Sequence, residues 1–586
     1  MGRDRLSRVK MAGLGRLCQL LERAGATRLA LSGGGLALLL ELRTLSCGVV
    51  SDDHVQAAMV RDSTRAAWDL FSFHTSRLET AQQIREGDIP WYVDPDVHQA
   101  FFRPLASLGH YFDYRFFAAF PWVAHAHSLA WLVALLFVVA WLFRRFEEGK
   151  WTAGLAAAVY ACSPPLALSV TWLAGRNVLI ATTLGMAALG MHHVYRQGSE
   201  RARLPAIALF LLSLTGGECS AGPFVYLLAY AGLYDHGSGR SRARSVAPYV
   251  LLGVLFWGGV FLSGYGVRGY GFYFDPHAGI VRQLPVLLDR CFRLFLYEFG
   301  WGHQEVIRGT PFSEVPTWSV LPAVAFGVAL AIAAVKDRAL RFWFLAAVGS
   351  TLPFCLTLAQ PRLLAAAHVG YSMAVVRLFA TLASGVGRRR LVAASVLVAA
   401  LASSIAAGAV CLHVTAGFVR SLSVTETIAA TAFASSAGKD AIVISGNWVL
   451  AHTILPVQRE QGLPTSRSMA FLSGVSVFEM DRPGPRTLVL RSPLGVIGAY
   501  GLILLTTPIP VGRTVRFNRG VLEVVATDPT LGPTEVRYDF DAPLEDGTMA
   551  WFVTLPTLLF APVPPPALGT RTLVWDGGFR VVPLTE

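Results

Sequence analysis

The stretch LALSGGGLALLLELRTLSCGVV, residues 29–50, is the first long apolar run of the chain, and Ser51-Asp52-Asp53-His54 follows it directly. Its length meets the ~20 residues that a membrane-spanning helix needs. The run lacks a small-residue cleavage pattern, so it predicts a retained first span and not a removable signal peptide. Glu41 and Arg43 lie inside this run, where charged groups are costly unless they face other helices or each other.

The composition of the chain supports a membrane protein. Of 586 residues, 53% are hydrophobic and 15% charged, and the mean hydropathy is +0.49. The net charge of +12 comes largely from Arg clusters between apolar runs, which the positive-inside rule explains better than nucleic-acid binding does. The seven Cys are scattered without CxxC spacing, so no zinc site or disulfide framework is predicted. We expect no required cofactor, and the sequence gives no support for a divalent metal.

Further apolar runs predict about eleven membrane-spanning helices in total. After residues 29–50 the predicted spans are 124–143, 151–170, 178–195, 204–214, 221–234, 246–264, 320–335, 342–358, 363–382 and 391–412. The stretch 280–299 is apolar but carries five charged residues, so we predict an interfacial helix there.

The Arg and Lys clusters fall on one side of this span pattern, which places the N-terminus in the cytoplasm. We therefore expect three parts: a cytoplasmic amphipathic N-terminus (1–28), a transmembrane domain (29–415) with its first outer loop at 51–124, and a soluble β-rich domain (416–586) outside. The outer compartment is expected to be periplasmic or lumenal, with a bacterial inner membrane preferred.

The β-rich domain is predicted from short β-branched runs separated by Pro and Gly. These runs are 441–444, 487–490, 514–517, 521–526, 536–540, 550–553 and 573–575, with a helix expected near 448–462. In the first outer loop, the apolar residues of 64–87 predict an amphipathic helix on the membrane surface that roofs a cavity over the Asp pair.

Several motifs occur in a characteristic order along residues 51–234. The acidic pair Asp52-Asp53 follows the first span, Phe102-Arg103-Pro104-Leu105 and an Asp113-Tyr114, Pro121, His125 series lead into the second, and Trp172-Leu173-Ala174-Gly175-Arg176 follows the third. This order resembles the GT-C glycosyltransferases, in particular the membrane proteins related to protein O-mannosyltransferases that often carry tetratricopeptide repeats. The chain departs from that pattern at Ser163-Pro164, where the family has His-Pro, at Gly217-Glu218, where it has Lys-Glu, and in lacking the repeats.

The resemblance implies transfer of a sugar from a polyprenyl-phosphate donor to an acceptor hydroxyl at the outer face of the membrane. The acceptor is left open as protein, glycan or lipid, with membrane lipid as a further partner and no nucleic acid. An Asp of the first loop would be the base of an inverting reaction, and we prefer Asp53 slightly over Asp52.

Arg103 and Arg176 are the candidate ligands of the donor phosphate, because a guanidinium holds phosphate at two points. Their structural alternatives are a carboxylate partner for Arg103 and interfacial snorkelling for Arg176. The other candidate cavity or substrate-binding residues are His54, His125, Trp172 and Glu218.

His125 has a structural hydrogen bond as its alternative, and Glu218 a purely structural role. The alternative function is a non-catalytic polyprenyl-lipid-binding or envelope scaffold protein.

Overall fold

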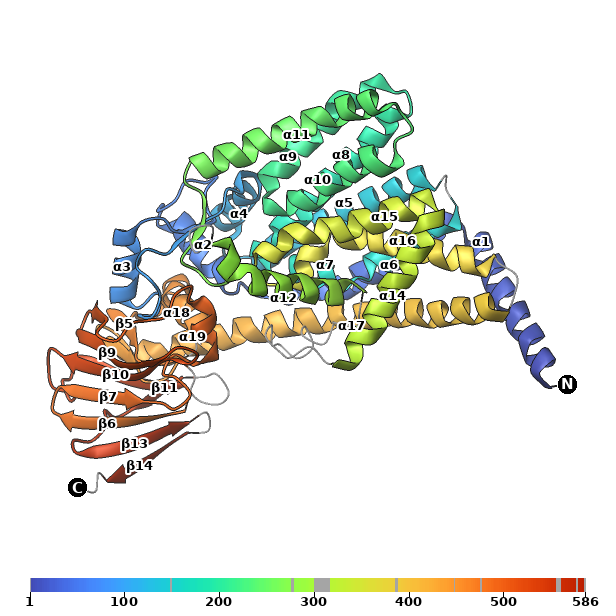
Figure 1. Ribbon diagram of the computed structural model, residues 1–586. Coiled ribbons are helices and arrows are strands. Elements are labelled where there is room, and N and C mark those ends of the chain that lie inside the picture. The colour runs from blue at the N-terminus through green and yellow to red at the C-terminus, as the bar shows by residue number, and fades with distance from the viewer. Residues whose placement is uncertain are drawn as a thin grey trace.

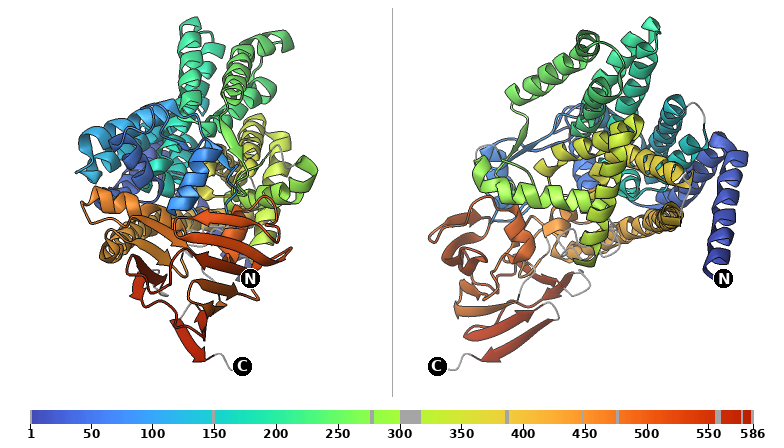
Figure 2. Two further views of the ribbon diagram at one scale, coloured as in Figure 1. Left: turned by 90° about the vertical axis from the view of Figure 1, so that its left-hand side faces the viewer. Right: turned by 45° about the vertical axis from the view of Figure 1, so that its right-hand side comes forward.

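The computed structural model describes residues 2–147, 150–275, 279–299, 317–384, 388–446, 448–474, 477–554, 560–575 and 578–583. Most of the chain is helical, and the strands are concentrated in a C-terminal part (Figure 1). The N-terminus and this β-rich part lie at opposite ends of the molecule in Figure 1 and in the right-hand view of Figure 2.

A helix lies at each of the predicted spans. These helices are α1 (Gly2–Glu41), α5 (Pro121–Phe146), α6 (Trp151–Ala161), α7 (Pro164–Thr171), α8 (Arg176–Arg196), α9 (Arg203–Gly216), α10 (Ala221–Ala229), α11 (Gly239–Leu262), α14 (Thr317–Lys336), α15 (Arg338–Thr351), α16 (Ala367–Ala383) and α17 (Arg388–Phe433). Six helical segments of the described chain are long and apolar enough to cross a membrane, and α6 with α7, bent by 51°, would make a seventh. The predicted class, a polytopic helical protein with a C-terminal β-rich part, is confirmed.

Two local features break the helices where the sequence contains Pro or Gly. The bend between α6 and α7 falls before Pro164, because a proline has no N–H for the preceding turn and is favoured at a helix start. Gly217, with φ 124°, ends α9, and a short 3-10 turn (Glu218–Ser220) leads into α10. The predicted pair of short helices at 204–234 is therefore confirmed as two helices joined by an irregular turn.

The β-rich part contains two sheets. Its strands are β4 (Asp440–Val443), β5 (Ser468–Phe471), β6 (Phe478–Gly484), β7 (Thr487–Arg491), β8 (Thr514–Phe517), β9 (Gly520–Asp528), β10 (Gly532–Phe540), β11 (Met549–Thr554), β12 (Phe560–Val563), β13 (Thr570–Trp575) and β14 (Gly578–Pro583). The seven-stranded antiparallel sheet has the order β14-β13-β6-β7-β10-β9-β8, and the four-stranded sheet has the order β12-β11-β4-β5 with β4 parallel to both neighbours. The two helices among these strands are α18 (Trp448–Glu460) and α19 (Gly498–Leu504).

Every predicted strand and the predicted helix near 448–462 are present, but β5, β6, β12 and β14 were not predicted. The sequence of β6, FEMDRPG, carries three charged residues. Arg491 and Arg571 bind Asp481, and Glu545 binds the buried Arg482, so each charge is compensated by a neighbouring element. Because those partners lie outside β6, the alternation of hydrophobic residues within the segment did not reveal the strand.

The first outer loop differs from the prediction. The expected amphipathic helix at 64–87 is wrong: the segment contains an irregular stretch, strand β1 (Ser72–His74) and only one short helix, α3 (Arg77–Glu86). Ser76 begins α3 by accepting a hydrogen bond from the Glu79 N–H, and Gly87, with φ 84°, ends it. Helix α3 contacts β5 and β8 of the β-rich part, and a Cβ at Gly87 would overlap the Met469 carbonyl. The first loop therefore packs against the C-terminal part instead of lying as one amphipathic helix.

The same loop contributes side chains to the core of the β-rich part. Trp91 and Tyr92 are buried in a cluster with residues of both sheets. The Trp91 indole N–H donates to the Leu472 carbonyl at 3.2 Å, and Arg513 donates to the Val93 carbonyl at 2.9 Å. The chain continues through β2 (His98–Ala100), which pairs with β1 and with β3 (Gly266–Arg268). The outer loops and the C-terminal part thus share one core.

Two longer helices complete the arrangement. Helix α12 (Ile280–Phe299) occupies the predicted interfacial segment, with exposed apolar residues along its first half. Helix α17 continues without a break from the helical part into the β-rich part, passing the predicted domain boundary at 415–416 (Figure 1).

Trp91→Ala removes a buried indole and should lower the free energy of unfolding of the β-rich part by about 3–5 kcal/mol, because it leaves a cavity where the first loop packs on that part. The measurement is thermal unfolding of the detergent-solubilised protein, with limited proteolysis of the C-terminal part. Trp68→Ala is the matched control, since Trp68 is 47% exposed. Equal loss in both variants would contradict a shared core.

Candidate active site

Helix α2 (Asp52–Arg61) carries the acidic pair and begins directly after the first span. Ser51 precedes it with φ 52°, a conformation that is uncommon for a residue with a side chain. The Ser51 N–H donates to Glu426 of α17 at 3.0 Å. This turn directs the two carboxylates of the first helical turn into different surroundings.

The side chain of Asp53, in the first turn of α2, is fully buried. Its carboxylate accepts hydrogen bonds from the Ala174 N–H at 2.7 Å and from the Val50 N–H at 3.4 Å. Burial raises the pKa of Asp53 to about 7, although the bond from Ala174 opposes the rise. Asp53 does not line the cavity described next, and its contacts attach α2 to the turn at Leu173–Gly175.

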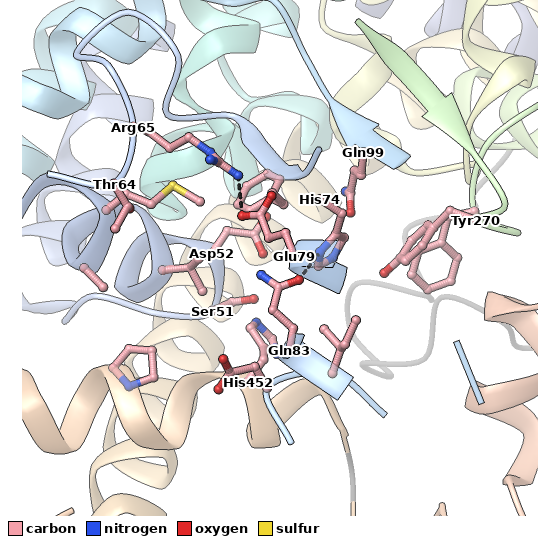
Figure 3. A pocket seen from close by; sticks show the side chains of 18 of the residues that line it. Ser51, Asp52, Thr64, Arg65, His74, Glu79, Gln83, Gln99, Tyr270 and His452 are labelled. Atoms are coloured by element: carbon pink, nitrogen blue, oxygen red, sulfur yellow. Dashed lines mark hydrogen bonds and ion pairs between the residues drawn. The ribbon is translucent and has the colours of Figure 1, made fainter. Parts of the chain in front are cut away.

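Asp52 lines a cavity of about 640 Å³ between the helical part and the β-rich part. Figure 3 shows Asp52 and Ser51 among side chains from the first outer loop and from α18. Burial raises the pKa of Asp52, while His452 and Arg362 oppose that rise. A carboxylate with a raised pKa is a stronger base than one in water. Of the two predicted base candidates, Asp52 is the one that a bound molecule can reach.

Arg362 also lines this cavity and was not among the predicted site residues. It lies in the 3-10 turn Pro361–Leu364, directly before α16. Its guanidinium lies 4.4 Å from the centroid of the Trp172 ring, and its Nε donates to the Gln360 side chain at 2.6 Å. Sequence alone offered one signal: Arg362 lies at the predicted outer end of a span, where the positive-inside rule does not account for it.

The predicted phosphate ligands Arg103 and Arg176 both have carboxylate partners. The Arg103 Nε donates to Glu218 at 2.7 Å, and the guanidinium lies 4.8 Å from the Phe71 ring and 4.4 Å from the Phe101 ring. The pair joins two predicted site residues, Arg103 at the start of α4 (Pro104–Phe117) and Glu218 after α9. Neither of them lines the cavity.

Arg176 is completely buried and connects three helices. Its guanidinium donates to Asp113 of α4 at 2.5 Å, and to Ser128 Oγ and the Ala124 carbonyl of α5 at 2.9 and 2.7 Å. These bonds use all three of its nitrogen atoms, and Arg176 does not line the cavity. The predicted His125 is also buried and bonds to the Gly48 carbonyl at 3.3 Å.

His54, the residue after the Asp pair, lies between two carboxylates of the C-terminal elements. Its Nδ1 is 2.8 Å from Glu460 of α18 and its Nε2 is 3.4 Å from Glu426 of α17. Burial alone would lower the pKa of His54, but the bonds to Glu426 and Glu460 raise it to about 9. A protonated imidazole therefore connects the acidic helix α2 to α17 and α18.

The C-terminal part supplies side chains to the cavity as well. His452 and Arg459 of α18 line it opposite α3. No local pattern in the sequence marks these two residues, because α18 has the pattern of an ordinary amphipathic helix. Among the described residues, no group of three or more His, Cys, Asp or Glu side chains is placed to hold a metal ion.

No protein-family model matches the chain, and no curated protein matches its sequence. Among solved structures, the chain is similar to ArnT from Cupriavidus metallidurans bound to undecaprenyl phosphate, with 13% sequence identity and a TM-score of 0.38 over 75% of this chain and 86% of that one. The apo-state structure of ArnT gives 13% identity and a TM-score of 0.39 over 75% and 85% of the two chains.

The contact of His54 with two carboxylates makes stability depend on pH. Its pKa is raised above the ordinary value of 6.5, so the stabilisation is fully present below pH 6.5 and is lost as the pH rises through about 9. The stability difference between the wild type and His54→Gln should be largest near pH 6, at most about 3 kcal/mol, and should shrink towards pH 9.

Thermal unfolding at a series of pH values measures this difference. His98→Gln is the control, because it removes a histidine that bonds a backbone carbonyl, that of Gly264. A difference for His54→Gln that stays constant from pH 6 to 9 would show that the imidazole is not charged in the folded protein.

Proposed function

We propose that the protein is a GT-C-type membrane glycosyltransferase that moves a sugar from a polyprenyl-phosphate donor to an acceptor hydroxyl. One observation carries the proposal: a carboxylate of raised pKa, Asp52, and a guanidinium, Arg362, line one cavity at the outer ends of the helices. A base for an incoming hydroxyl and a cation for a leaving phosphate are the two groups that this transfer requires.

The reaction is a single displacement. The Asp52 carboxylate takes the proton of the acceptor hydroxyl while the hydroxyl oxygen bonds to the anomeric carbon of the donor sugar. The bond from that carbon to the phosphate oxygen breaks, and its electron pair leaves on the phosphate, with inversion at the carbon. The Arg362 guanidinium binds the leaving phosphate, and the Trp172 ring beneath it fixes its plane.

Asp53 and Arg176 support this chemistry through position. Asp53 holds α2 on the backbone of Ala174, which directs the neighbouring Asp52 towards the cavity. Arg176 ties the same turn to α4 and α5. We propose that Asp52, and not Asp53, is the catalytic base in this chain. We also propose that Arg362 binds the donor phosphate, the role predicted from the sequence for Arg103 and Arg176.

The orientation is also proposed. The Arg clusters place the N-terminus in the cytoplasm, so the cavity and the β-rich part would face the periplasm or lumen of the source cell. The opposite positions of the N-terminus and the β-rich part in Figure 1 support this arrangement.

Asp52→Asn should lower the rate of sugar transfer by roughly 10²–10⁴-fold, because the amide cannot take the proton. Asp53→Asn keeps an oxygen for the Ala174 N–H and should lower transfer by less than about tenfold. Transfer from a polyprenyl-phosphate sugar by the purified protein measures both, with donor binding as the second readout. Loss of transfer in Asp53→Asn alone would reverse the assignment. A wild type that binds donor and transfers nothing would favour the lipid-binding or scaffold alternative.

Arg362→Gln should lower kcat/KM for the donor by roughly 10²–10³-fold and weaken binding of polyprenyl phosphate itself, because the leaving group loses its cation. Arg268→Gln, at an exposed position on β3 outside the cavity, is the matched control. Wild-type binding and turnover in Arg362→Gln would remove this residue from the site.

A further inference from the structure

The cavity is larger than the two reacting groups require. Its volume of about 640 Å³ lies within the ~300–1,000 Å³ range that encloses a drug-sized ligand. Besides Asp52, its lining includes a donor end with Trp172, Tyr273 and Arg362, and a second region with residues of α3 and α18. We call the second region the far lobe; its polar lining residues are Arg65, Glu79, Gln82, Gln83, Glu86, Asp88, His452 and Arg459.

The far lobe has an unfavourable charge for an anionic acceptor. Of its cations, Arg65 is held by Glu79 at 2.5 Å, so its charge is already compensated. Glu86, Asp88 and Arg459 are the remaining charged groups of the lobe. The excess of carboxylates over guanidinium groups in the lobe would repel a phosphorylated head group. Binding of the phosphate is therefore left to Arg362 at the donor end.

The polar groups of the far lobe are planar and already oriented. The Gln83 Oε1 is bonded to His74 Nδ1 at 2.9 Å, which turns the Gln83 amide N–H group to the side of Ser51 and Asp52 (Figure 3). The Gln82 amide donates to Glu86 at 2.8 Å, so the second oxygen of that carboxylate is available to accept another bond. Carboxamides and carboxylates of this kind offer two bonds to a pair of adjacent hydroxyl groups.

An extended peptide fits the lobe less well. A peptide that adds to a sheet needs a free strand edge, and β1 is the edge strand nearest the cavity. The Arg65 Nε already occupies the Ser72 carbonyl of that strand at 2.9 Å. The edge is therefore partly closed, whereas the side chains of the lobe remain directed at the cavity.

We propose that the far lobe binds a carbohydrate without anionic groups, and that this carbohydrate is the acceptor of the transfer reaction. The inference rests on the proposed function and deepens it by naming the acceptor class. Gln82, Gln83 and Glu86 of α3 bind ring hydroxyls, α18 closes the opposite side, and the hydroxyl nearest Asp52 is the one that reacts.

The test is binding of neutral glucose, mannose and N-acetylglucosamine oligomers to the full-length protein in nanodiscs, followed by saturation-transfer NMR and calorimetry. We expect one oligomer series to bind, and Gln83→Ala to weaken it by roughly three- to tenfold, the effect of one lost hydrogen bond. Gln82→Ala, which alters an exposed side chain of the same helix, should weaken binding in the same range and serves if Gln83→Ala folds poorly.

Gln461→Ala is the matched control, because Gln461 follows α18 and bonds Thr427 outside the cavity. Equal affinity in the Gln82, Gln83 and Gln461 variants would overturn the assignment of the lobe. Repeating the binding on Asp52→Asn with saturating sugar-loaded donor separates the two sugar positions: retained binding supports an acceptor site, and loss of binding shows that the oligomer occupied the donor's sugar position.

The outcome also separates this inference from the proposed function. Transfer to a neutral oligosaccharide supports both. Transfer to a serine or threonine peptide, or to a phosphorylated lipid, with no oligosaccharide binding keeps the glycosyltransferase and overturns the carbohydrate acceptor. Oligosaccharide binding at the far lobe without any transfer keeps the binding site and overturns catalysis.

Discussion

The hydrogen bond from the Ala174 N–H to the Asp53 carboxylate is the contact on which the site depends. This bond connects the acidic pair that follows the first span to the turn that precedes α8. The two segments are far apart in the sequence. Because successive residues of a helix point about 100° apart, burying Asp53 against this turn commits Asp52 to another direction. The buried member of the pair fixes the helix, and the neighbouring member meets the cavity.

The same division of roles recurs among the arginines. Arg176 is buried in an ion pair with Asp113 and connects three helices. The described partners of Arg362, in contrast, are an aromatic ring and an amide. A guanidinium with a buried carboxylate partner has its charge balanced inside the protein, and moving it to bind phosphate would break that buried ion pair at a cost of about 3–5 kcal/mol. Burial and pairing therefore distinguish cations that hold the fold from a cation that is available to a ligand.

The sequence predicted the helices well because spans depend on local hydrophobicity, which a window of residues contains. For the same reason it predicted β4, β7 to β11 and β13, but it missed β5, β6, β12 and β14. In β6 the charged residues are balanced by Arg491, Arg571 and Glu545 of other segments. The site was predictable only in part. The Asp pair was indicated by its position after a span, but which carboxylate is accessible depends on the backbone of Ala174. His452 and Arg459 come from a helix nearly 400 residues later, and no local pattern marks such a contact.

Helix α17 has one further consequence for how the β-rich part meets the membrane. Its 46 residues span about 69 Å, against about 30 Å of hydrocarbon in a bilayer. The continuous rod therefore sets the height of the β-rich part above the lipid, while Glu426 near its end bonds α2 through Ser51 and His54. Lengthening the rod by one residue would raise the domain by about 1.5 Å and also rotate it by about 100°, which would turn α18 away from α3. A change in the length of α17 thus alters both the height of the β-rich part above the membrane and the alignment of the cavity walls. For this reason α17 can change length only in near-whole turns.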